Sequence, residues 1–123
     1  MATQDTCVSV APYFTAHEGK LDAFKALCDQ LVQMTSQETT ALYCGFGFDG
    51  DQAVCREAYQ NADAWLAHLQ IVGGVFGEML KVADLTRLEF HAPEQELVKV
   101  RKAIADMGLQ AQLFTMGDGY RRA

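Results

Sequence analysis

The chain has 123 residues, of which 50% are hydrophobic, and a formal net charge of -6 at pH 7. This length suits one domain with a real core, so we expect a single domain over residues 1–123. The acidic balance argues against a nucleic-acid-binding surface, which needs clustered Lys and Arg. No apolar run is long enough to span a membrane, and the N-terminus lacks the features of a secretion signal, so we expect a cytoplasmic protein.

The cysteines and histidines do not form a metal-binding pattern. Cys7, Cys28, Cys44 and Cys55 are scattered without a Cys-x-x-Cys pair, and each falls inside a predicted strand or helix. That placement is typical of reduced thiols in a packed core. A zinc site needs close ligand pairs with a histidine nearby, and the three histidines are not so arranged. We therefore expect no metal site.

The N-terminal part of the chain predicts a strand followed by a helix. Residues 6–14 are rich in β-forming side chains, and Pro12 indicates an edge strand or a bulge near the end of this strand. Apolar residues recur at spacings of three and four between residues 20 and 37. This period predicts an amphipathic helix whose apolar stripe covers a sheet.

A second strand and a hairpin follow. Residues 39–49 alternate, with Phe46 on one face and Tyr43 on the other, and an Asp-Gly turn signal ends the run. A two-residue turn would set Cys44 opposite Glu57 in the next strand. A different turn length would shift this register by one residue and exchange the two faces.

The third strand leads directly into a second helix. Residues 53–60 alternate as a strand and place Glu57 and Tyr59 on one face. Asn61 is a strong N-cap, and a helical period follows it. One row of this helix contains Trp65, His68, Val72, Val75 and Met79, and the next row contains Leu66, Leu69, Phe76 and Leu80. The pair Gly73-Gly74 predicts a kink or two short helices, because each glycine costs a helix about 1 kcal/mol relative to alanine.

The C-terminal part predicts a strand, a helix and a short strand. Residues 84–92 place Arg87 on one face. Residues 94–107 have a helical period, with Gly108 as the C-cap, and residues 111–116 form the last strand. The whole order predicts a ferredoxin-like α+β sandwich, βαββαβ plus a C-terminal helix and strand, with all helices on one face of an antiparallel sheet. We expect a second copy to cover the other face, so that two facing sheets enclose a cavity in each subunit.

The segment from Glu57 to His68 carries a recognisable pattern. It has the form E-x-Y-x-N-x-D-A-W-x-x-H, which resembles the E-x-W-x-S-x-x-A-x-x-x-H signature of the antibiotic biosynthesis monooxygenase (ABM) superfamily. Gly19 matches the turn before the first helix in that family. The resemblance covers residues 6–92, and residues 93–123 resemble an extension found in some members.

The resemblance implies a dimeric α+β barrel. Members include cofactor-independent oxygenases of phenols and quinols, haem-degrading enzymes, isomerases of small molecules, and proteins without known activity. Haem-degrading members carry an Asn in the first strand, where this chain offers Cys7 and Ser9. They also place an iron-ligating His about ten residues after a helical Trp, where this chain has Val75. Haem is therefore not expected.

A cofactor-free oxygenase needs a base, groups that orient a phenolate, and a dry aromatic pocket. His68 is the candidate base, because an imidazole takes and returns a proton near neutral pH. Tyr59 and Arg87 are the other candidate catalytic residues, as orienting groups for an anionic substrate. The candidate pocket residues are Trp65, Glu57, Phe46 and Tyr43.

Each of these residues also has a structural interpretation. His68 could hold the helix to the sheet, Trp65 could be core, and Tyr59 could be a dimer contact. Glu57 could pair with Arg87 or with a backbone N–H. The sequence therefore predicts a homodimeric, cofactor-independent monooxygenase of a small aromatic or quinol-like molecule. Two alternatives remain open, a non-catalytic small-ligand-binding dimer and an oxygen-independent isomerase of a small hydroxy-ketone.

Overall fold

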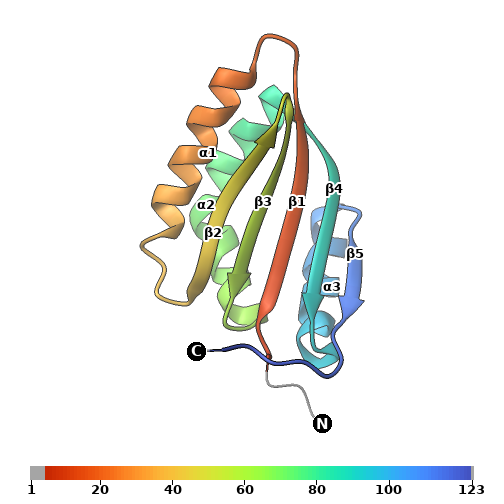
Figure 1. Cartoon of the computed structure of the whole chain (residues 1–123). Coiled ribbons are helices and arrows are strands. Elements are labelled where there is room, and N and C mark those ends of the chain that lie inside the picture. Colours follow the sequence, from red (N-terminus) through yellow and green to blue (C-terminus); the bar gives the residue numbers. More distant parts are fainter. Residues whose placement is uncertain (1–4, 123) are drawn as a thin grey trace.

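A computed structural model describes residues 5–122 of the chain as one five-stranded sheet with three helices (Figure 1). The elements in chain order are β1 (Val8–Ala16), α1 (Leu21–Thr35), β2 (Ala41–Asp49), β3 (Gln52–Tyr59), α2 (Ala62–Val82), β4 (Ala83–Ala92), α3 (Glu94–Met107) and β5 (Gln112–Thr115). The predicted order of elements is confirmed, and the helix over residues 94–107 has the predicted bounds.

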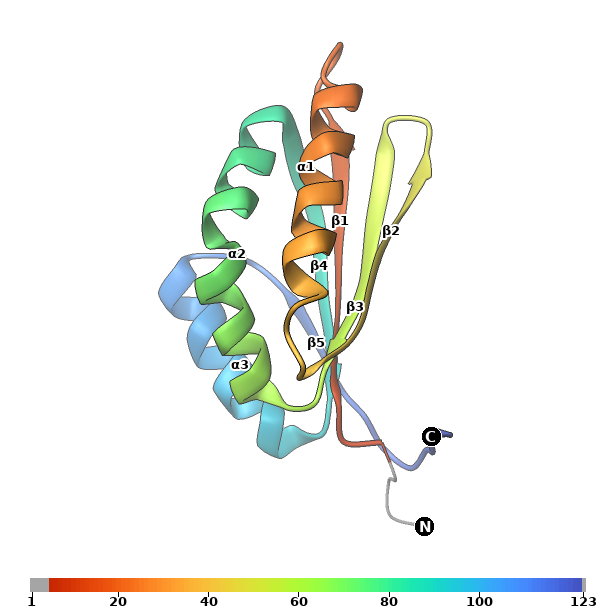
Figure 2. The ribbon, with the colours of Figure 1, turned by 90° about the vertical axis from the view of Figure 1, so that its left-hand side faces the viewer.

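The sheet has the strand order β2-β3-β1-β4-β5, and α1, α2 and α3 all pack on one face of it (Figure 2). The first four strands pair antiparallel, which confirms the ferredoxin-like α+β fold. β5 instead pairs parallel to β4, so the prediction of a wholly antiparallel sheet is wrong. The cause is α3, because a helical crossover returns the chain in the same direction.

The hairpin register is the one predicted for a two-residue turn, with Cys44 opposite Glu57. The prediction from Pro12 is confirmed only in part. β1 lies in the middle of the sheet between β3 and β4, so it is not an edge strand. The β1–β4 register does shift between Tyr13 and Phe14, directly after Pro12. An irregularity there fits a residue that has no N–H to donate.

α2 is one uninterrupted helix, so the prediction of two short helices at Gly73-Gly74 is wrong. Asn61 caps the helix as predicted, because its side-chain oxygen accepts a hydrogen bond from the Ala64 N–H at 2.9 Å. Val72 and Val75, on either side of the two glycines, are buried. Burial of this row stabilises the helix more than the two glycines destabilise it.

Two hydrophobic clusters fill the space between the helices and the sheet. The α1 cluster contains Phe14, Ala16, Phe24, Cys28, Leu31, Ala53, Val72, Val75, Met79 and Ala83. The α3 cluster contains Val8, Val10, Tyr59, Ala62, Ala64, Trp65, Leu88, Phe90, Ala92, Leu97, Val100 and Ile104. α2 contributes to both clusters, because its buried row runs the length of the sheet.

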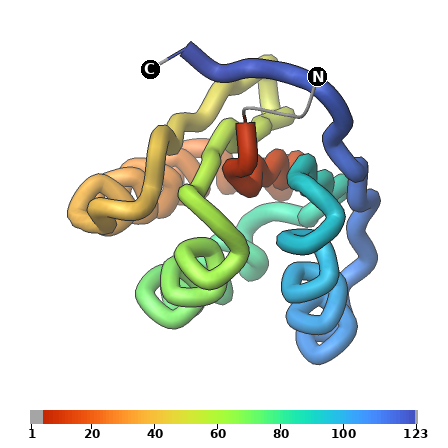
Figure 3. The backbone as a smooth tube through the Cα atoms, turned by 90° about the horizontal axis from the view of Figure 1, so that it is seen from below, coloured from red at the N-terminus to blue at the C-terminus, as the bar shows by residue number. Residues whose placement is uncertain are grey.

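The opposite face of the sheet, which we call the outer face, has no helix over it within residues 5–122. The C-terminal segment passes over this side at one end of the sheet, near the start of β1 (Figure 3). In the part of the chain that the structure describes, no helix is both long and apolar enough to cross a bilayer.

Candidate functional site

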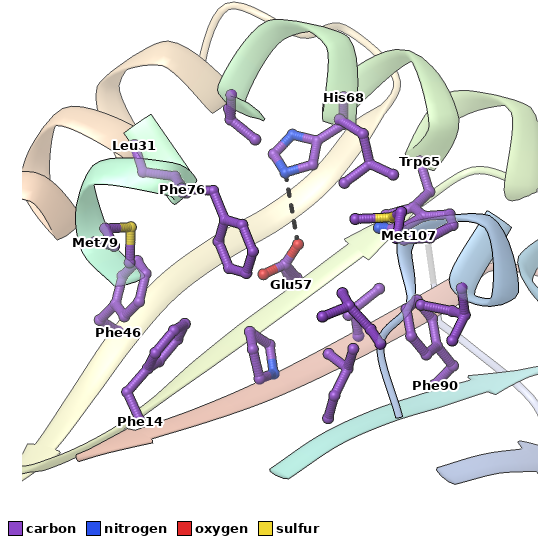
Figure 4. Close-up of a pocket in the computed structure, with 17 residues that line it drawn as sticks. Phe14, Leu31, Phe46, Glu57, Trp65, His68, Phe76, Met79, Phe90 and Met107 are labelled. Atoms are coloured by element: carbon purple, nitrogen blue, oxygen red, sulfur yellow. Dashed lines mark ion pairs between the residues drawn. The ribbon is translucent and has the colours of Figure 1, made fainter. Parts of the chain in front are cut away.

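A narrow pocket lies between the helices and the sheet, where the α1 cluster meets the α3 cluster (Figure 4). Among the residues that line it, Glu57 and His68 are the ionisable ones, and the rest are apolar or aromatic. The cavity has a volume of about 60 Å³, which is room for about four water molecules. A larger ligand therefore enters only when flexible lining side chains turn.

Local structure brings the two polar side chains to this place. Glu57 lies on the face of β3 that α2 covers, because side chains of a strand alternate between faces. His68 follows the Asn61 cap by about two helical turns on the buried row of α2. The two side chains approach each other from the sheet and from the helix, with His68 Nε2 3.7 Å from Glu57 Oε1.

These residues belong to a longer chain of buried polar contacts, which we call the inner network: Glu38, His68, Glu57 and Tyr59. His68 Nδ1 lies 2.8 Å from Glu38 Oε2, and the Tyr59 hydroxyl donates to Glu57 Oε1 at 2.8 Å. The side chains of Glu38, His68 and Glu57 are 6%, 4% and 8% exposed. Since an ionised carboxylate only accepts, contact with Glu38 places the proton of neutral His68 on Nδ1.

Burial decides the electrostatics of this network. Loss of hydration raises the pKa of Glu57 above its ordinary range, and hydrogen bonds from Cys55 and Tyr59 and the charge on His68 offset this only in part. Burial also raises the pKa of the Tyr59 hydroxyl. Glu57 is thus favoured as a neutral acid that can donate a proton, next to an imidazole Nε2 that can accept one.

The structure brings four of the predicted site residues to one pocket. His68, Glu57, Trp65 and Phe46 all line it. The cavity lies between the helices and the sheet of a single chain, whereas we expected two facing sheets to enclose it. The reason is that Glu57 and His68 lie on the helix-covered face of the sheet.

The other predicted residues lie elsewhere. Tyr59 is fully buried, and its hydroxyl donates a hydrogen bond to Glu57, but its side chain does not line the pocket. Tyr43 is 44% exposed, with Arg56 over its ring. Arg87 binds Glu89 and Gln112 on the outer face. The predicted pairing of Glu57 with Arg87 is therefore wrong, because the sheet separates the two side chains.

Sequence reasoning missed Glu38. It lies in the loop between α1 and β2, where no periodic pattern assigns a direction to a side chain. Its partner His68 is 30 residues further along the chain. The contact arises from the packing of α1 against α2, so no local signal would have found it.

A second set of polar contacts lies on the outer face, which we call the outer network: Ser9, His91, Glu89 and Arg87. Ser9 Oγ lies 2.9 Å from His91 Nδ1, and His91 Nε2 lies 3.1 Å from Glu89 Oε1. Arg87 Nε donates to Glu89 Oε2. This hydrogen bond, with that from His91, lowers the pKa of Glu89. Within residues 5–122, no three His, Cys, Asp or Glu side chains are placed to hold a metal ion.

No family model and no curated protein matches the chain. Among solved structures, MupZ from Pseudomonas fluorescens is 37% identical over 95% of each chain, with a TM-score of 0.87. An antibiotic biosynthesis monooxygenase matches with a TM-score of 0.62 at 16% identity. The chain therefore belongs to the same family as MupZ, and it has the fold of the antibiotic biosynthesis monooxygenases.

Smaller ABM-fold structures lack part of this chain. The monooxygenase above covers 68% of it, with 94% of its own length, and Rv0793 from Mycobacterium tuberculosis covers 72% of it, with 95% of its own length. Rv0793 is 21% identical, with a TM-score of 0.64. Each of these two structures thus leaves more than a quarter of this chain without a counterpart. That share is close in size to residues 93–123, which contain α3 and β5 and supply part of the pocket wall.

Proposed function

We propose that the protein is a cofactor-independent monooxygenase of a small phenolic or quinol-like molecule, with His68 as the base. The observation that carries the proposal is the pocket itself. An apolar cavity is lined by one imidazole, that of His68, whose Nδ1 lies 2.8 Å from the buried carboxylate of Glu38. Such a partner orients the ring and stabilises the imidazolium that forms when the base takes a proton.

The chemistry needs little else from the protein. His68 Nε2 takes the hydroxyl proton of the substrate, and the resulting electron-rich anion gives one electron to oxygen. The radical and superoxide combine to a hydroperoxide, and its O–O bond then breaks. One oxygen atom stays as the carbonyl of a quinone, because the C–H bond of the carbon that holds it breaks at the same time. The other oxygen atom leaves as water, with one proton returned by His68 and the other from that C–H bond. All the electrons that reduce oxygen come from the substrate, and apolar walls keep bulk water from the anion.

Oxygen consumption with a panel of hydroquinones and polyphenols tests this proposal on chelator-treated protein. We expect uptake by the wild-type chain and a loss of about 100-fold or more in the His68→Ala variant. His91→Ala is the matched control, because it removes a histidine of the outer network and should leave uptake unchanged. Uptake that survives in the His68→Ala variant would exclude this residue as the base.

An oxygen-independent isomerisation of a small hydroxy-ketone is the second candidate. One observation favours it, namely that burial favours the neutral form of Glu57 and that Glu57 lies 3.7 Å from His68 Nε2. An acid and a base side by side can move a proton between two substrate atoms. Turnover under argon would support this reaction. Ligand binding without turnover in air or argon would instead indicate a non-catalytic binding protein.

We propose that the protein is a homodimer that pairs through the outer face of the sheet. This face carries Ala11 at the centre of β1 and the exposed ring of Tyr43, without a covering helix in residues 5–122. Ala11→Arg would place a charge in the middle of the interface. We expect this variant to sediment as a monomer, while Val98→Arg, on the exposed side of α3, stays dimeric. A wild-type chain that sediments as a monomer would refute this proposal.

A further inference from the structure

The acid and the base lie in the middle of the pocket rather than at its end. Figure 4 shows Phe14, Phe46 and Met79 on one side of Glu57 and His68, and Trp65, Phe90 and Met107 on the other side. The first group belongs to or packs against the α1 cluster. Trp65 and Phe90 belong to the α3 cluster and contact each other edge to face at 4.9 Å. The pocket therefore has two apolar arms that meet at one polar centre.

α3 forms the wall of the second arm. Ile104 is buried at 6% exposure, and Met107 lines the same pocket but is 43% exposed. Met107 therefore lies at the rim, where the cavity meets solvent. Its unbranched thioether side chain can turn aside at small cost, so a ligand can widen the narrow arm without moving the backbone.

The charges around the polar centre restrict what binds there. In the described part of the chain, residues 5–122, no Lys or Arg side chain lines the pocket, whereas Glu38 and Glu57 both lie within contact of His68. A carboxylate or phosphate of a ligand would be desolvated here without a cation to compensate. A neutral oxygen group fits, because it can accept a proton from Glu57 or give one to His68.

We propose that the substrate is an elongated, uncharged molecule with its reacting oxygen group in the middle and an apolar arm on each side. Ile104 and Met107 then determine how long the arm on the α3 side can be, so α3 is a specificity element. This inference rests on the proposed function in taking the pocket as the reaction site. It concerns binding alone, so it can be tested without turnover.

Heptan-4-ol and heptan-1-ol test the position of the oxygen group. They have the same composition, but the hydroxyl is central in the first and terminal in the second. Both are neutral, and calorimetry gives their dissociation constants. The emission of Trp65, the single tryptophan of the chain, reports whether they enter this pocket. We expect heptan-4-ol to bind about fivefold more tightly, because both arms are filled while its hydroxyl stays hydrogen-bonded. Equal affinity, tighter binding of heptan-1-ol, or no binding of either alcohol would overturn the inference.

Two variants of α3 test the specificity element with Trp65 kept as the only tryptophan. Met107→Phe should weaken binding of heptan-4-ol about tenfold by filling the arm. Val98→Phe, on the exposed side of the same helix at 57% exposure, is the matched control and should change nothing. Ile104→Ala should instead favour nonan-5-ol over heptan-4-ol, which secures the test if the phenylalanine variant does not fold.

The outcomes separate the inference from the proposed function. If Met107→Phe and Val98→Phe changed the affinity for heptan-4-ol equally, α3 would not be a specificity element. If oxygen uptake still depended on His68 in that case, the inference alone would fail. If the alcohols bound in the expected order but no substrate consumed oxygen, the proposed reaction would fail while the shape of the ligand would stand.

Discussion

The two faces of the sheet carry two networks built from the same kinds of residue. Each contains a histidine, a hydroxyl group and at least one carboxyl group, the inner network with His68 and the outer network with His91. Their electrostatics are opposite, because burial raises the pKa of Glu57 whereas hydrogen bonds from Arg87 and His91 lower that of Glu89. The environment of a carboxyl group, rather than its neighbours in sequence, thus decides whether its protonated or its ionised form is favoured.

The largest difference between the networks should appear when one carboxylate is removed from each. Glu38→Ala leaves the buried imidazole of His68 without its partner, so we expect a loss of about 3 kcal/mol in the free energy of unfolding. Glu89→Ala should cost about 0.5 kcal/mol, because Arg87 and His91 can be hydrated instead. Urea unfolding at pH 7 measures both values.

Glu38→Gln is the control for packing in this experiment, since it keeps the size of the side chain and an oxygen that accepts from His68. It should recover most of the stability that the alanine variant loses. We expect both Glu38 variants to lose oxygen uptake, because neither alanine nor a neutral amide stabilises an imidazolium. Equal costs for Glu38→Ala and Glu89→Ala would mean that burial does not distinguish the two networks.

A smaller effect is expected from the acid of the inner network. Because the pKa of Glu57 is raised in the folded chain, its contribution to stability is complete below the ordinary pKa of a carboxyl group and is lost as pH rises through the folded value. Glu57→Gln mimics the neutral acid at every pH and still accepts from Tyr59. We expect this variant to be more stable than the wild-type chain by about 1 kcal/mol at pH 8, and the two to converge near pH 4.

Urea titrations across this pH range compare the two chains. A difference that stays constant with pH, or one that grows towards acid, would mean that the pKa of Glu57 is not raised in the folded chain. Val75→Ile, a substitution in α2 away from the network, controls for unrelated effects of pH on unfolding.

Much of this arrangement could be predicted from the sequence. Alternation in β3 placed Glu57 and Tyr59 on one face, and the Asn61 cap with the helical period placed His68 on the buried row with Trp65. These are local rules, in which a residue's direction follows from its position in an element. The hairpin register followed in the same way from a two-residue turn.

What could not be predicted depends on how elements pack. The sequence pattern showed that Arg87 alternates with Leu88, but not that its face is the one that no helix covers. Glu38 lies in a loop, and its contact with His68 exists only because α1 and α2 lie side by side. The prediction of two short helices at Gly73-Gly74 failed for a related reason. The cost of glycine in a helix can be read from the sequence, but the burial of the neighbouring side chains depends on how α2 packs.

The smallest effect is expected from Glu89 in the outer network, whose pKa is shifted in the opposite direction to that of Glu57. Because Arg87 and His91 lower the pKa of Glu89, its contribution to stability is present above the ordinary pKa of a carboxyl group and is lost as pH falls through the folded value. Glu89→Gln should therefore cost about 0.5 kcal/mol at pH 7, and this cost should vanish near pH 3. Added salt should reduce it further, since these side chains are partly hydrated. A cost that persists at pH 3 and in high salt would show that Glu89 acts by packing, and the contrast with Glu57 would then rest on Glu57 alone.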